Sequence, residues 1–158
     1  MHIAIFASLL FASPTVEASC CVGSPRTASL CPICGLDVPK DTPEIDNKVV
    51  LDRAGKKTEY RCVLCALADV KADRGDLVIV TPSEKKGKPV RIVRAAGKWS
   101  VEPETARFAY VKGSHSQCEI RYRAVTDKDA LDAYVRTKPK ILASAKLIEL
   151  DEMIKRSE

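Results

Sequence analysis

The sequence predicts a small single domain of the α+β class, built from an antiparallel sheet and two or three helices. The chain has 158 residues, of which 46% are hydrophobic and 30% charged. That size and balance are typical of one globular domain. In the middle of the chain, short apolar or alternating runs are separated by turn residues, as in an antiparallel sheet. Segments with apolar side chains at helical spacing stand before and after these runs.

The first 18 residues have the pattern of a secretory signal peptide. Residues 3–12 form an uncharged apolar run that is too short to span a bilayer, and residues 16–18 (Val-Glu-Ala) offer a small-x-small cleavage pattern. The usual Lys or Arg before the run is missing, so an N-terminal core strand or helix is the alternative interpretation. We expect an exported protein, periplasmic or anchored at the cell envelope, with a tether over residues 19–30. Cys20 stands where a bacterial lipoprotein would carry its lipid.

The folded domain is expected over residues 31–158. Residues 47–51 and 58–61 have strand character and flank a charged, Gly-containing segment, which predicts a hairpin. Residues 62–71 predict a helix, because apolar or thiol groups recur at i, i+3 and i+4. Gly75 is expected to end that helix.

Further strands and a second helix follow. The strand candidates are residues 77–81, 90–94, 98–101, 108–111 and 118–123. A helix is predicted over residues 127–136, with Thr126 as its N-cap and Pro139 just past its end. The tail over residues 146–154 reads as a short strand that runs into a terminal helix, with a boundary that the pattern leaves open.

The cysteines are the most informative residues, at seven against two histidines. Cys31 and Cys34 form a Cys-x-x-Cys knuckle, in which the following Gly35 lets backbone N–H groups point at the sulfurs. Cys62 and Cys65 form a second pair on a predicted helix, where a three-residue spacing places both thiols on one side. The predicted hairpin would fold the first pair back toward the second. Four thiolates could then meet around one soft ion, Cu(I) or Zn(II).

Disulfides are the alternative for the same cysteines, because the pairs of an exported protein can simply be bridges. The spacer between Cys34 and Cys62 is longer than the roughly 15–20 residues common in compact zinc sites. A thioredoxin-type redox role would need a βαβ context, which the predicted elements lack. No thiol is paired with a base at motif spacing, so we expect no enzymatic activity.

His115 and Cys118 are further candidate ligands. His115 lies in a polar loop three residues before Cys118, which faces inward on the predicted strand. Together they could bind Cu(I) or Zn(II), and the alternative is a solvated loop histidine beside a buried structural cysteine. The net charge of +5 is spread along the chain, which argues against a nucleic-acid partner.

The run from Cys31 to about Met153 resembles the NosL family, the accessory proteins of nitrous-oxide reductase. The resemblance is carried by short segments at residues 31–38, 60–65, 106–114, 124–130 and 147–153. The two Cys-x-x-Cys pairs also look like a TRASH/YHS-type metal-binding motif. The resemblance implies an α+β fold, export, a lipid anchor in many members, and Cu(I) binding for delivery to a copper enzyme. Leu36 departs from it, because the family has a Met there in its Cys-Gly-Met.

The sequence therefore predicts an exported Cu(I) carrier that uses clustered cysteine thiolates and hands the ion to a copper-enzyme client protein. The predicted ligands are Cys31, Cys34, Cys62 and Cys65, followed by His115 and Cys118. The alternative function is a secreted interaction domain stapled by Zn(II) or by disulfides, which would unfold without them.

Overall fold

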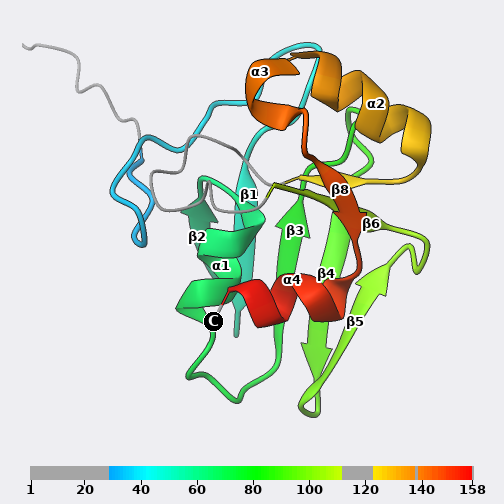
Figure 1. Ribbon diagram of the computed structural model, residues 1–158. Coiled ribbons are helices and arrows are strands. Elements are labelled where there is room, and N and C mark those ends of the chain that lie inside the picture. Colours follow the sequence, from blue (N-terminus) through cyan, green and yellow to red (C-terminus); the bar gives the residue numbers. More distant parts are fainter. Residues whose placement is uncertain (1–28, 112–122, 138, 158) are drawn as a thin grey trace, which may run out of the picture.

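The computed structural model describes residues 29–111, 123–137 and 139–157. It confirms the α+β class and the antiparallel pairing of the strands. The strands form two sheets, a five-stranded one in the order β2-β1-β3-β4-β5 and a three-stranded one in the order β7-β6-β8 (Figure 1). The division into two sheets depends on pairing between distant segments, which local periodicity does not reveal.

The larger sheet is antiparallel throughout and has one apolar face, and its chain crosses over between β2 and β3 so that β3 pairs with β1. Its strands are β1 (Val49–Arg53), β2 (Lys56–Tyr60), β3 (Leu77–Thr81), β4 (Val90–Ala95) and β5 (Lys98–Glu102). Burial alternates along the central strands, so that Leu77 and Ile79 on β3 and Val90 and Ile92 on β4 enter the core. This is the pattern of a sheet that is covered on one side.

The β1–β2 hairpin is longer than the sequence predicted. Arg53 pairs with Lys56, so only Ala54 and Gly55 remain in the turn. Both turn residues have positive φ, 51° and 82° respectively, as a two-residue type I′ turn requires. The backbone N–H of Gly55 also donates to the Asp52 carboxylate at 3.0 Å. The charged segment is therefore mostly strand, and the hairpin leads the chain into the second cysteine pair.

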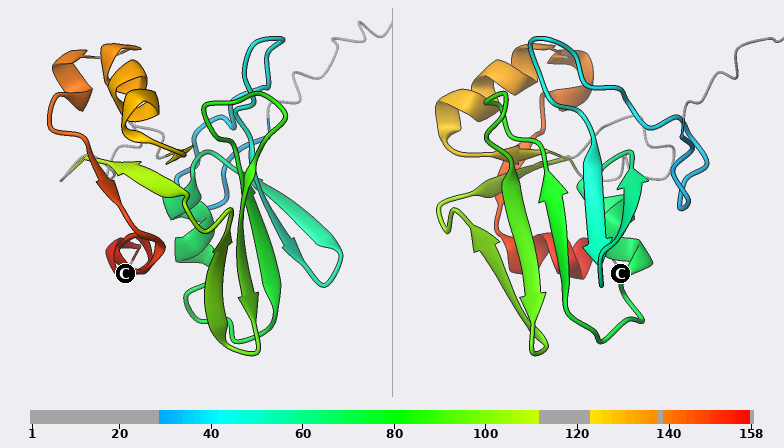
Figure 2. Two further views of the ribbon diagram at one scale, coloured as in Figure 1. Left: turned by 90° about the vertical axis from the view of Figure 1, so that its right-hand side faces the viewer. Right: turned by 180° about the vertical axis from the view of Figure 1, so that it is seen from behind.

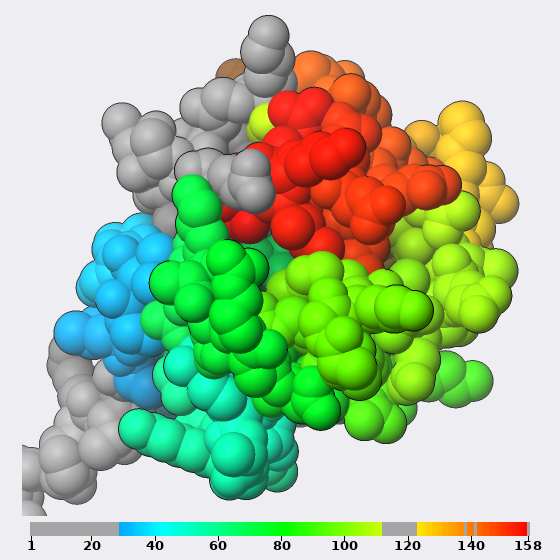
Figure 3. Space-filling view, turned by 90° about the horizontal axis from the view of Figure 1, so that it is seen from below, coloured from blue at the N-terminus to red at the C-terminus, as the bar shows by residue number. Residues whose placement is uncertain are grey.

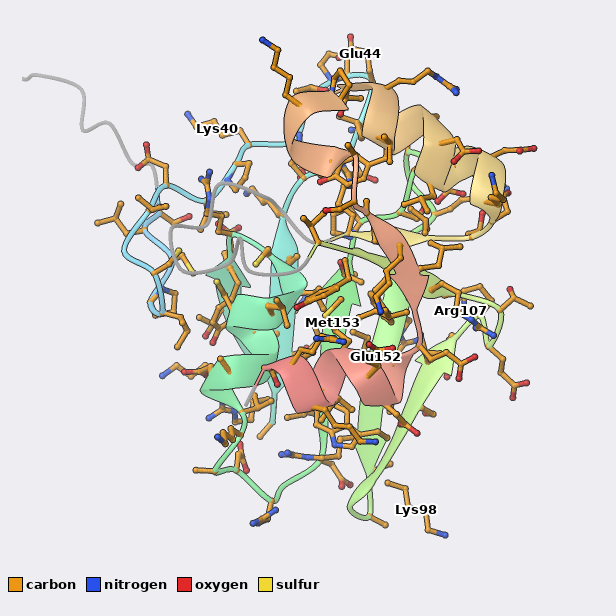
Figure 4. All side chains as sticks on the ribbon, in the orientation of Figure 1. Lys40, Glu44, Lys98, Arg107, Glu152 and Met153 are labelled. Carbon is orange, nitrogen blue, oxygen red and sulfur yellow. The ribbon has the colours of Figure 1, made fainter. Side chains whose placement is uncertain are left out.

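Two helices cover the apolar face of the larger sheet. They are α1 (Val63–Asp69) and α4 (Leu150–Arg156), which contact each other (Figure 2). Five consecutive residues of α1, from Val63 to Leu67, are buried. Met153, labelled on α4 in Figure 4, is also fully buried. Because α1 is buried over most of its length, the cysteine that it carries is held by core packing.

The smaller sheet carries the remaining helices. Its strands are β6 (Arg107–Tyr110), β7 (Ala124–Val125) and β8 (Lys146–Ile148), and the helices are α2 (Lys128–Thr137) and α3 (Pro139–Leu142). The strand-to-helix order of the tail is confirmed. The predicted cap is wrong by one residue: Ala130 N–H donates to the Asp127 carboxylate at 2.7 Å, because α2 begins at Lys128. The hydroxyl of Thr126 instead donates to Glu84. Of the predicted strand over residues 118–123, all but Arg123 lies outside the described residues.

Arg94 fastens the end of α1 to the sheet. Its side chain points into the core from β4, and its guanidinium donates to the carbonyl oxygens of Gly75 (2.7 and 2.9 Å), Asp73 (2.9 Å) and Val70 (3.3 Å). It also lies over the ring of Trp99, 5.1 Å from its centroid. Arg94 therefore donates to three carbonyl groups at and beyond the C-terminus of α1, of which that of Val70 also accepts from Asp73 N–H.

We predict that Arg94→Met lowers the free energy of unfolding by about 3 kcal/mol, because it removes the hydrogen bonds of a buried guanidinium and its ion pair with Asp73 at 3.5 Å. The matched control is Arg91→Met on the outer face of the same strand. Arg91 is exposed, and its nearest carboxylate contact is a long ion pair with Glu102, at 3.7 Å. That change should stay within about 0.5 kcal/mol. Urea unfolding of both variants measures the difference, and equal losses would show that Arg94 does not fasten α1.

Candidate metal centre

The first cysteine pair lies in a tight knuckle held by backbone hydrogen bonds. Gly35 N–H donates to the Cys31 carbonyl at 2.8 Å, and Cys31 N–H donates to the Leu36 carbonyl at 2.9 Å. Gly35 has a φ of +70°, in the left-handed region that favours glycine. The sequence prediction of a glycine-dependent knuckle is thus confirmed. From below, the knuckle residues (blue in Figure 3) form one edge of the molecular surface.

The second pair lies where β2 passes into α1. Cys62 is the N-cap residue of α1, with extended dihedral angles (φ −154°, ψ 169°). Cys65 lies within the helix and is completely buried. The Cys62 Sγ lies 3.6 Å from the Cys65 Sγ, at hydrogen-bond distance for sulfur. The prediction that the two thiols lie on the same side is confirmed, although Cys62 precedes the helix instead of belonging to it.

Three of the four sulfurs form a cluster. The Sγ atoms of Cys31, Cys34 and Cys65 all lie within 4.8 Å of one another. Three sulfurs placed evenly around one ion at the usual zinc–thiolate length of about 2.3 Å lie about 4.0 Å apart, so the cluster needs at most a small contraction to hold a metal ion. No disulfide joins any of the four described cysteines. The cluster can therefore bind a metal ion, and its composition of sulfur alone favours a soft one.

Hydrogen bonds lower the pKa of one thiol of the cluster. Burial acts to raise the pKa of Cys31. Hydrogen bonds to its sulfur outweigh burial, and they come from the backbone N–H groups of Arg61, Cys34 and Ile33 and from the Cys34 side chain. The pKa of Cys31 therefore lies below its ordinary value. A lowered pKa favours the thiolate, which is the form that binds a metal.

A polar network fixes the second pair relative to the sheet. The Tyr60 hydroxyl donates to the Asp69 carboxylate at 2.8 Å, and Arg53 pairs with the same carboxylate at 2.8 Å and with Asp73 at 3.0 Å. Burial and the hydrogen bond to Asp69 raise the pKa of Tyr60, so it stays a neutral donor. The network joins β1 and β2 to α1 on both sides of Cys62 and Cys65.

The knuckle also carries an apolar collar that the sequence analysis missed. In the part of the chain that the structure describes, the large hydrophobic side chains that remain exposed are Leu30 (62%), Ile33 (43%) and Leu36 (41%). Cys34, in their midst, is the partly exposed sulfur of the cluster, whereas Cys31 and Cys65 are buried. The signal was available in the sequence, because aliphatic residues recur every third position around the knuckle cysteines, in a segment that Pro32 and Gly35 exclude from a helix.

His115 and Cys118 lie outside the described residues, as do Cys20 and the expected signal peptide. Within the described ranges, no helix is long and apolar enough to cross a membrane.

No family model matches the chain, and no curated protein or solved structure matches it either.

Proposed function

We propose that this protein is an exported carrier of Cu(I), which it binds through Cys31, Cys34 and Cys65 and passes to a copper-enzyme client protein. The observation that carries the proposal is the convergence of three thiols, from two separate segments, within 4.8 Å of one another. The proposal assigns no catalytic step to the site.

The ligand set favours Cu(I) over Zn(II). Thiolates are soft ligands that bind both Cu(I) and Zn(II), so the number of sulfurs distinguishes the two ions. Structural zinc sites are almost always four-coordinate, whereas the mutual cluster here contains three sulfurs. Three thiolates are a sufficient set for Cu(I) and an incomplete one for structural zinc.

The exposure of one ligand favours a carrier over a permanently closed site. Cys31 and Cys65 are buried, but Cys34 is partly exposed within the collar of Leu30, Ile33 and Leu36. An incoming thiolate of a client protein could reach an ion beside Cys34 and bind it before the bond between the ion and the Cys34 sulfur breaks. Exchange through shared thiolates transfers the ion without releasing it into water. The apolar collar would bury its side chains against the client during that step.

The resemblance to the NosL family is in line with this proposal. The structure also suggests how the chain compensates for its departure from the family at Leu36. Leu36 replaces the family's methionine and offers no sulfur. In this chain the buried thiol of Cys65 completes the three-sulfur set. We therefore propose that a thiolate from α1 takes the role that the thioether would have had.

A structural zinc site is the second candidate function. The observation that favours it is the position of Cys62, whose sulfur lies 3.6 Å from that of Cys65. If Cys62 swung toward the cluster, four thiolates could close around Zn(II). The protein would then be a metal-stapled domain for interaction with another protein.

Metal content and a thiol count decide between these functions. The full chain would be purified anaerobically from its own compartment. We expect one equivalent of copper, with the four described cysteines all reduced. One equivalent of zinc would favour the structural site instead. Absence of metal together with disulfide-paired thiols would remove the copper proposal.

A further inference from the structure

Cys62 differs from the other three thiols in its geometry. Its sulfur contacts Cys65 at 3.6 Å, yet it is not a member of the group whose sulfurs all lie within 4.8 Å of one another. Cys62 is also buried, with 1% of its surface exposed. A buried thiol that touches a candidate ligand but stands outside the ligand cluster needs a separate explanation.

The backbone around Cys62 is fixed on both sides. Tyr60 ends β2 and Val63 begins α1, and both side chains are buried in the core. The Cys62 carbonyl accepts a hydrogen bond from Ala66 N–H at 3.3 Å, so the residue is tied to the first turn of the helix. Moving its backbone toward Cys31 and Cys34 would disturb close-packed core residues, which is costly.

We propose that Cys62 is a positioning residue: its thiol donates a hydrogen bond to the Cys65 sulfur, holds that sulfur toward Cys31 and Cys34, and itself stays outside the ligand set. This inference rests on the proposed function and deepens it, because it makes the site a three-thiolate site. Partners that hydrogen-bond to metal ligands commonly fix the ligand's orientation and tune its affinity. Cys62 thereby sets the coordination number, and with it the preference for Cu(I) over four-coordinate Zn(II).

Two replacements of Cys62 separate positioning from ligation. Cys62→Ser keeps a hydroxyl donor, whereas Cys62→Ala removes the donor. We expect three Cu–S contacts by X-ray absorption in the wild type and in both variants. Cu(I) affinity, measured by competition with a chelator, should fall about 10- to 100-fold in Cys62→Ala and stay close to wild type in Cys62→Ser. The matched control is Cys34→Ser, which should lower the sulfur count from three to two.

The opposite result has a distinct signature. If Cys62 is a ligand, Cys62→Ser and Cys62→Ala weaken binding equally and the sulfur count falls by one in each, as in the control. That outcome would overturn the inference.

Failure of the copper proposal would show differently, as absence of Cu(I) binding by the wild type. In that case Hg(II), which binds thiolates whatever the native metal is, serves as the probe. An Hg–S count of three in both the wild type and Cys62→Ser supports the positioning role. A fall from four to three overturns it.

Discussion

Replacing Cys31 and Cys65 together by serine is expected to reduce Cu(I) binding from one equivalent to none. The two residues are the buried members of the three-sulfur cluster, one in the knuckle and one on α1. The thiols of Cys34 and Cys62 that remain do not belong to a common cluster without them. Cys34 alone, with Cys62 outside the cluster, cannot replace the preorganised set of three thiolates. The loss of Cu(I) binding should therefore be complete and not partial. Metal content after dialysis and chelator competition both measure it.

The control for this experiment removes a sulfur elsewhere in the core. Met153 is fully buried on α4, and Met153→Leu conserves volume and costs less than about 1.5 kcal/mol. Cu(I) binding should be unchanged in this variant. Circular dichroism shows whether the double variant is folded. Because burying two serine hydroxyl groups can itself destabilise the protein, the Cys31→Ala, Cys65→Ala variant is measured as well. Tight binding that persists in a folded double variant would assign the metal to other residues, with His115 and Cys118 as the next candidates.

Local patterns were sufficient to predict most elements of the fold. The strand over residues 77–81 has the predicted bounds, because its apolar run is bounded by turn residues on both sides. The hairpin before it was predicted with a loop that is too long, since charged residues can extend a strand when two turn residues accept positive φ. The pairing of Phe108 with both Ala124 and Ile148 joins segments far apart in the chain. Periodicity carries no information on such pairing, so the second sheet was not predicted.

The candidate site, like the fold, could be predicted in part from local sequence patterns. The two Cys-x-x-Cys spacings predicted that thiols would meet, and three of them do. The prediction treated Cys62 and Cys65 as equivalent, because residues three apart on a helix share a face. That argument requires both residues to have helical dihedral angles. Cys62 is extended at the helix start, and although its sulfur contacts that of Cys65, only Cys65 belongs to the three-sulfur cluster, so the two are not equivalent.

The metal-free, reduced protein is expected to melt cooperatively, and Cu(I) is expected to raise its stability. Several of the largest fully buried side chains, among them Tyr60, Phe108, Ile79 and Ile92, belong to the two sheets. Most of this core lies outside the knuckle, which adds Cys31 and Val38 to it, so the domain should not need an ion to fold. An ion that binds only the folded state adds about 2.7 kcal/mol when its free concentration is 100 times the dissociation constant. A thermal melt with and without buffered Cu(I) measures the shift.

This melt distinguishes a Cu(I) carrier from a metal-stapled domain. The Cys31→Ser, Cys65→Ser protein should show no Cu(I)-dependent shift, because it lacks the site that links binding to folding. A metal-stapled domain behaves differently: its binding energy is its folding energy, so a chelator unfolds it. If the reduced, chelator-treated wild type has no cooperative transition, the ion is structural and the carrier proposal is wrong. If it melts cooperatively and gains stability only on loading, the ion is cargo, because a protein that must release its metal to a client has to remain folded after the release.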